Sequence, residues 1–206
     1  MKIELVKKIA NFFGLFRGDE EKAVRIYKGR AFTRDVAFQF RMGAGFAGDV
    51  NRTHPSAIEP ELGDPANFPN GYGQAVMIGA SNGVRNPVAG DNGATSIFGI
   101  VVRPFPVQQT VGGISAAFAS EVPQTNQPVD VLKSGYVTVK LNGAAAASKG
   151  APVFVWVAAS GGGHVQGGFE AVATGGSTIA LDASGNRIYF NGPADSNGLV
   201  ELVFNP

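Results

Sequence analysis

The sequence contains no cysteine, only two histidines and a single tryptophan. Without thiols the chain can form neither disulfides nor thiolate metal sites, and a cysteine nucleophile is excluded. His54 and His164 lie far apart, and neither has the spacing of a zinc site or a serine nucleophile elbow nearby. The acidic residues follow no calcium-loop pattern. We therefore expect no catalytic site, no cofactor and no bound metal ion.

Charge is also scarce, at 16% of residues with a net charge of +1, which argues against binding to nucleic acid. The charges are unevenly placed. Residues 1–52 hold 11 of the 17 basic residues but 6 of the 16 acidic ones, a local net of +5 that leaves −4 for the remainder. This basic N-terminal section is suited to pair with an acidic surface of a neighbouring copy or of another protein.

The chain has no apolar run long enough to cross a bilayer, and no cleavage site of the signal-peptide kind. Residues 2–17 instead predict an amphipathic helix, because large apolar residues recur at three- and four-residue spacings. Such a stripe is poorly tolerated on a free tail, so docking on this protein or a partner is favoured over membrane attachment or fraying. The stripe consists of Leu5, Ile9, Phe12 and Phe16.

Glycine is abundant, at 29 of 206 residues, and short β-type segments alternate with turns. We predict one domain over residues 35–206, preceded by an arm and connector at residues 1–34. The strand count of about eight to ten predicts a mainly β fold, an antiparallel β-barrel or jelly-roll-like sandwich with an N-terminal helical arm. The clearest candidates are residues 36–41, 74–78, 96–102, 136–141, 152–157, 178–181, 187–190 and 199–204.

Residues 129–173 are predicted to form the centre of this fold. Residues 136–141 alternate apolar and polar side chains, whereas residues 152–157 are uniformly apolar and predict a strand covered on both faces, with Trp156 in the core. The segment 142–150 contains Asn-Gly and Lys-Gly, so a reversal there is expected to bring the two strands side by side. Residues 104–128 contain four prolines and predict a long loop that makes contacts outside the body.

Four segments of this sequence together resemble the structural cement, or capsid decoration, proteins of tailed bacteriophages. They are AFQFRMGAGFAGDVNRTHP (37–55), SIFGIVVRPFPVQQ (96–109), DVLKSGYVTVKL (130–141) and FNGPADSNGLVELVFN (190–205). The resemblance covers roughly residues 35–206. It implies a non-enzymatic, often dimeric β protein that is made in the host cytoplasm. In the virion it would lie on the outside of an icosahedral shell, bridge neighbouring major capsid subunits and stabilise the shell.

The partners expected from this resemblance are the major capsid protein and further copies of the chain, with no membrane and no nucleic acid. Three regions are predicted to make the contacts: the amphipathic arm, the glycine-rich junction near residue 45, and the proline-containing loop. An alternative is a carbohydrate- or ligand-binding β module, or a hydrolase, that uses the loops around His54 and His164. Besides the arm residues given above, the predicted contact residues are Arg41, Phe46, Arg52, His54, Arg103, Phe105, Gln108 and Gln109.

Overall fold

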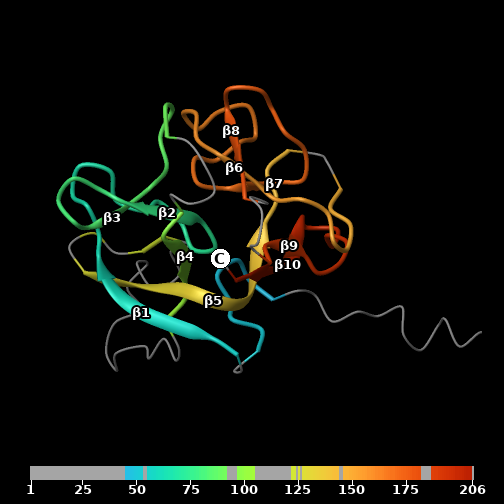
Figure 1. The fold of residues 1–206 in the computed structure, drawn as a ribbon, viewed down its shortest axis with the longest axis horizontal. Coiled ribbons are helices and arrows are strands. Elements are labelled where there is room, and N and C mark those ends of the chain that lie inside the picture. The colour runs from blue at the N-terminus through green and yellow to red at the C-terminus, as the bar shows by residue number, and fades with distance from the viewer. Residues whose placement is uncertain are drawn as a thin grey trace, which may run out of the picture. The chain divides into compact units, whose positions relative to one another are not determined.

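The computed structural model describes residues 45–52, 55–91, 97–104, 122, 123, 125, 127–143, 146–181 and 187–205. All regular elements in this part of the chain are β-strands, which confirms the mainly β class (Figure 1). The strands are β1 (Ala57–Leu62), β2 (Ala75–Ile78), β3 (Val84–Arg85), β4 (Gly99–Val102), β5 (Pro128–Lys140), β6 (Phe154–Trp156), β7 (Phe169–Glu170), β8 (Thr178–Ala180), β9 (Tyr189–Phe190) and β10 (Leu199–Phe204).

The larger sheet is built around β5, the longest strand. Its order is β3-β2-β4-β5-β10-β9, and β1 also pairs with β5. The N-terminal half of β5 lies between β1 and β4, because both strands pair with the same residues of β5. The C-terminal half lies between β10 and the segment around Val50, which forms a bridge with Val137. The two halves of β5 therefore have different neighbours on both edges.

Gly135 marks the change of partners in β5. Its φ of +141° lies where side chains are rarely tolerated, and a Cβ there would approach the Pro55 carbonyl oxygen to 3.1 Å and Ser56 Cβ to 3.2 Å. Residues 55 and 56, just before β1, thus pass closely over this glycine. Close passage is possible because no side chain stands between the two backbones.

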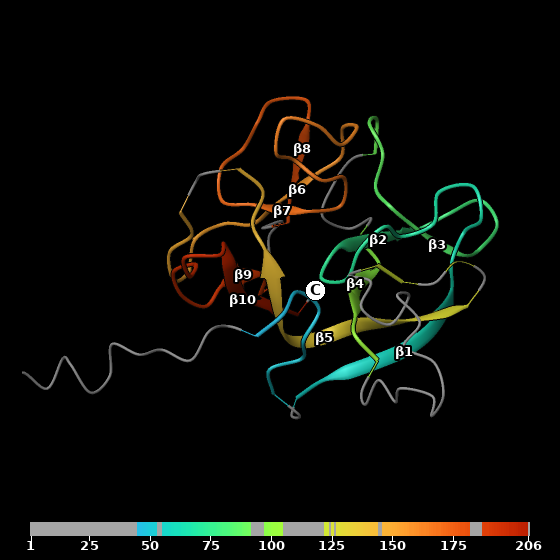
Figure 2. The ribbon, with the colours of Figure 1, turned by 180° about the vertical axis from the view of Figure 1, so that it is seen from behind.

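The smaller sheet has the order β7-β6-β8 and is shown in orange in Figures 1 and 2. It is connected to the larger sheet by a parallel bridge between Leu141 and Phe169 and by a hydrogen bond of 2.8 Å from the Asn142 N–H to the Phe169 carbonyl oxygen. The two sheets share one hydrophobic core. Side chains from both of them bury there, among them Leu132, Val139, Val155 and Phe169.

A second, smaller core covers the opposite face of the larger sheet. It contains Val76, Val101 and Val131, with the partly buried rings of Phe68 and Tyr72 packed against it. Successive side chains of β5 point to opposite faces and so contribute to both cores: Leu132 points to the shared core and its neighbour Val131 to the smaller one. This half of the sheet is therefore buried on both faces.

Three details of the predicted fold are wrong. The reversal at residues 142–150 does not pair its two flanking strands, since β5 and β6 belong to different sheets. Strand β6 is not covered on both faces, because Phe154 and Trp156 are partly exposed while Val155 is buried. Strand β1 was not predicted, because five of its six residues are exposed and it has no buried apolar face.

The larger sheet runs from β3 to β9, and a single parallel bridge between Gly63 and Val84 links β3 back to the end of β1. This one bridge does not confirm a barrel or a jelly roll. The amphipathic arm, the candidate strand 36–41 and residues 105–121 of the proline-containing loop lie outside the described residues. The division at residue 34 stays a prediction. No described segment forms a helix that is long and apolar enough to cross a membrane.

Candidate contact surface

The glycine-rich junction predicted near residue 45 runs along the C-terminal half of β5. The N–H of Gly48 donates to Thr138 and that of Asn51 donates to Tyr136, at 2.8 and 3.0 Å. The Arg103 N–H donates to the Gly48 carbonyl oxygen at 2.9 Å, which joins the residue after β4 to the same segment. Gly48 has a φ of +90°, and a Cβ there would collide with Tyr72. Residues 45–52, the added segment, are therefore fixed by backbone hydrogen bonds along the C-terminal half of β5.

An arginine with two aromatic neighbours lies at the start of this segment. The Arg103 guanidinium carbon is 5.4 Å from the centroid of the Phe46 ring and 5.1 Å from that of Tyr72. Its Nε donates to the Ala47 carbonyl oxygen at 3.0 Å and lies 3.9 Å from Asp49 Oδ1. Phe46 is 67% exposed even so. The cluster thus presents a large apolar ring on a fixed base, with a cation beside it.

Tyr72 contributes its ring as a neutral partner. Burial raises the pKa of the Tyr72 phenol, the Arg103 charge lowers it, and the Asp130 carboxylate raises it, with a net rise above its ordinary value. The phenol therefore stays protonated at neutral pH. Its ring face remains available to the Arg103 cation.

A second arginine lies at the end of the segment. The Arg52 guanidinium carbon is 4.0 Å from the centroid of the Tyr136 ring, and its Nη2 lies 3.2 Å from Glu201 Oε2. Glu201 also accepts hydrogen bonds from the side-chain amides of Asn51 and Asn191. One carboxylate on β10 thereby joins the added segment to the turn after β9.

Glu201 is expected to make stability depend on acid. Burial raises its pKa, but hydrogen bonds from Asn191 and Arg52 outweigh this effect and bring the pKa below its ordinary value. A lowered pKa in the folded state stabilises the fold above the ordinary carboxyl range, and this stabilisation is lost as pH falls through the lowered pKa. Glu201→Gln should cost about 1–3 kcal/mol at pH 7 by urea denaturation.

The difference in stability between the parent chain and Glu201→Gln should shrink as the pH falls into the acid range. Glu59→Gln is a suitable control, because Glu59 is exposed on β1 and should change stability by less than about 0.5 kcal/mol. A difference between Glu201→Gln and the parent that stays constant from neutral to acid pH would contradict the assigned role.

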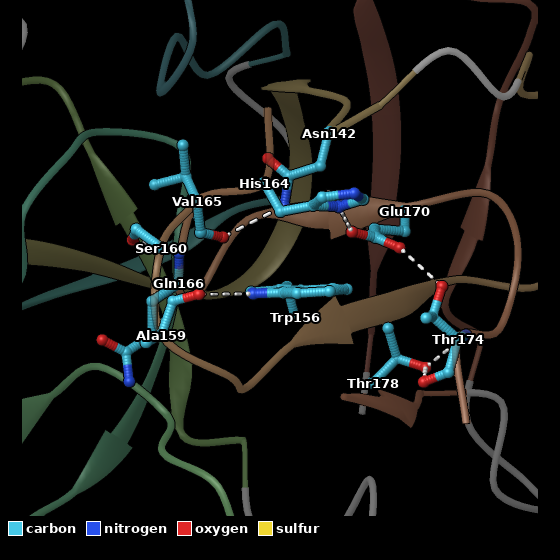
Figure 3. Close-up of polar contacts among 10 residues, drawn as sticks. All are labelled: Asn142, Trp156, Ala159, Ser160, His164, Val165, Gln166, Glu170, Thr174 and Thr178. Carbon is cyan, nitrogen blue, oxygen red and sulfur yellow. Dashed lines mark hydrogen bonds and ion pairs between the residues drawn. The ribbon is translucent and has the colours of Figure 1, made fainter. Parts of the chain in front are cut away.

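His164 belongs to a closed polar cluster on the smaller sheet (Figure 3). Its ring stacks on Trp156, with 4.1 Å between centroids and an interplanar angle of 18°. Its Nδ1 lies 2.5 Å from Oε1 of Glu170, which is only 5% exposed. The Trp156 Nε1–H donates to the Ala159 carbonyl oxygen at 3.3 Å. The predicted core position of Trp156 is thus only partly correct, since its ring is half-buried under the histidine.

The contacts of this cluster indicate a structural role. Its polar groups bond to one another, and the Trp156 face that meets His164 is covered, so that face offers no platform for a sugar ring. The described residues contain no group of three or more histidine or acidic side chains that could hold a metal ion. The geometry therefore gives no specific support to the ligand-binding alternative at His164, and His54 lies outside the described residues.

The structure brings together two regions that were predicted separately, because Phe46 of the junction lies against Arg103 at the start of the proline-containing loop. Arg52 lies on the same added segment as Phe46, with its guanidinium group on Tyr136. Sequence reasoning missed Tyr72, Tyr136 and Glu201. The other predicted contacts lie outside the described residues: Leu5, Ile9, Phe12, Phe16, Arg41, His54, Phe105, Gln108 and Gln109.

Comparison with known proteins places these features in a family context. A protein-family model described as XM1 gp53 minor capsid protein matches residues 36–204. A chain in the solved structure titled "The capsid of Myoviridae Phage XM1" is similar in fold, with a TM-score of 0.56 and 20% sequence identity. That match covers 81% of this chain and 93% of the phage chain. The comparison with curated proteins gave no match.

Proposed function

Because the chain belongs to the XM1 gp53 minor capsid protein family, we propose that it lies on the outer surface of an icosahedral capsid and bridges neighbouring major capsid subunits. Family membership makes it a capsid-associated structural protein of a tailed-phage virion. The proposal adds a position and a mechanical role. By bridging subunits, the protein stabilises the shell against expansion.

The observation that carries this proposal is the exposed Phe46 ring beside Arg103 and Tyr72. Aromatic residues and arginine are enriched in protein interfaces, where a few anchors supply most of the binding energy. Here the backbone that carries the ring is held by a tight turn, because the Phe46 N–H donates to Asp49 Oδ2 at 2.8 Å and the Asp49 N–H donates back to the Phe46 carbonyl oxygen at 3.0 Å. A backbone that is already ordered loses little entropy on binding, so this position is a suitable anchor.

Phe46→Ala should weaken binding to empty shells about tenfold, which corresponds to about 1.4 kcal/mol per site. The measurement is co-sedimentation of purified protein with shells that lack it. Val172→Ala is the matched control, because Val172 is 57% exposed and lies beyond β7 on the smaller sheet, where no anchor is proposed. The fold should be unaffected in both variants, since neither side chain is buried.

Shell stability is then compared with and without bound protein by heating both samples. The decorated shells should withstand a higher temperature. If full occupancy does not raise the temperature that the shells withstand, the stabilising role is overturned. If Phe46→Ala and the parent chain bind equally well, Phe46 is not part of the contact surface.

A further inference from the structure

Strand β1 combines three properties that do not suit a strand exposed to solvent. Residues 57–62 pair only with β5 among the described strands, and their second edge is met at one end, where Gly63 bridges Val84 of β3. Ile58 is 44% exposed and Leu62 is 69% exposed. Long exposed edge strands with apolar side chains invite association, so natural proteins cover or block them. This strand is therefore a candidate interface.

The chemistry of β1 restricts what can cover it. Pro60 in its centre has no N–H, which is a typical means of preventing another strand from adding to an edge. The flanking Glu59 and Glu61 would repel a second copy of β1 placed against it. These residues disfavour pairing by backbone and favour a basic partner that contacts side chains. Ile58 and Leu62 alternate with the two glutamates and so point to the opposite face of the sheet, and a partner lying along the edge of β1 would meet the apolar pair on one side and the acidic pair on the other.

Lys133 on β5 offsets only part of this negative charge. Its Nζ lies 2.8 Å from the centroid of the Phe98 ring, so the ammonium group is directed onto an aromatic face. Burial lowers the pKa of Lys133, and the charges of Glu59 and Glu61 act in the opposite direction. One lysine against two carboxylates leaves β1 with a net negative charge.

From these features we infer that β1 is the docking site for residues 2–17 of a second copy of this chain. That segment carries an apolar stripe, and Lys2, Lys7, Lys8 and Arg17 outnumber its single acid, Glu4. Its apolar and basic character complements the apolar and acidic side chains of β1. The inference rests on the proposed function, because an array of copies on one shell brings the arm of each copy near the body of another.

The length of the chain permits such an exchange. Residues 18–44 separate the arm from the first described residue, and 27 residues can span up to roughly 90 Å when fully extended. A contact of this kind links copies in a head-to-tail manner, with arm and acceptor at different places on each chain. Many weak links of this type, repeated over a shell, produce a strong combined attachment.

Cysteine trapping tests the inference directly, because the natural chain has no cysteine and each variant carries a single thiol. One full-length chain carries Leu62→Cys and a differently tagged chain carries Phe12→Cys; Leu5→Cys, Ile9→Cys and Phe16→Cys are tested in parallel. The chains are mixed, both free in solution and on shells, and treated with a short bis-maleimide. A matched acceptor control uses Val172→Cys, which is similarly exposed and lies in the loop between β7 and β8.

At least one arm position should give cross-linked heterodimer with Leu62→Cys about tenfold above the Val172→Cys control, the ratio expected for a contact of about 1.4 kcal/mol. Adding Glu59→Lys and Glu61→Lys to the acceptor chain should reduce that yield to the control level. A further chain carries both Leu62→Cys and Phe12→Cys. If this chain cross-links only within itself and no heterodimer forms, docking in a second copy is overturned. Equal yields at both acceptor positions would overturn β1 as the site.

Shell binding of the same chains separates this inference from the proposed function. If the chains bind shells but give no heterodimer above the control, docking at β1 is overturned and the capsid role stands. If they bind no shells, the capsid role is overturned, and the cross-linking yield in solution still decides whether β1 accepts the arm of another copy.

Discussion

Replacing Phe169 by alanine is expected to lower the free energy of unfolding by about 3–5 kcal/mol, the range for truncating a fully buried aromatic side chain. Phe169 is 0% exposed and belongs to the core that the two sheets share. Its backbone also forms the bridge to Leu141 and accepts the hydrogen bond from Asn142. A cavity here weakens the packing at the point where the sheets join. Urea denaturation followed by tryptophan fluorescence measures the change, since Trp156 is on the neighbouring strand β6.

Phe46→Ala is the matched control, because it removes the same side chain from an exposed position. It should change the free energy of unfolding by no more than about 0.5 kcal/mol. A loss below about 1 kcal/mol for Phe169→Ala would contradict the assigned core position. Phe169→Ala is thus expected to lower stability, whereas Phe46→Ala is expected to weaken capsid binding without lowering stability.

Replacing Gly135 by alanine is expected to cost roughly 2–4 kcal/mol, from backbone strain and overpacking together. Its φ of +141° is rarely adopted by other residues, and the new Cβ would lie 3.1 Å from the Pro55 carbonyl oxygen and 3.3 Å from Leu132 Cδ1. The strand cannot relieve both contacts, because β1 and β10 fix β5 on either side of this residue. The free energy of unfolding in urea again gives the measurement.

Gly175→Ala is the control for this change, because a Cβ at Gly175 meets nothing within 4 Å. It should alter stability by less than about 0.5 kcal/mol. If Gly135→Ala is as stable as Gly175→Ala, the close passage of residues 55–56 over β5 is wrong.

The strands that could be predicted from the sequence are those with a regular burial pattern. Residues 199–204 were predicted as a strand and form β10, and residues 136–141 overlap the C-terminal half of β5. Residues 136–141 alternate because one face of the sheet lies on the shared core, whereas residues 199–204 are apolar except for Glu201 and end in three buried residues. Strand β1 has no such face, and its edge position is fixed by pairing with a segment about 70 positions away, which local pattern does not reveal.

The contact surface was predicted in part. Phe46 and Arg103 were each selected, yet their proximity depends on the hydrogen bond between residues 103 and 48 and follows only from tertiary pairing. Glu201 is the single polar residue of a predicted strand, and nothing local distinguishes a carboxylate that accepts hydrogen bonds from three side chains from one that is solvated. The family resemblance was confirmed because a minor capsid protein family matches residues 36–204, which include all four segments except the last residue of the fourth.

The two-part pairing of β5 has a mechanical consequence. Its 13 residues cross the sheet without interruption, and each half is hydrogen-bonded on both edges to different segments. Ladder bonds in antiparallel pairs stand perpendicular to the strands. Tension along β5 would therefore load these bonds in shear, many at once, rather than open them one by one.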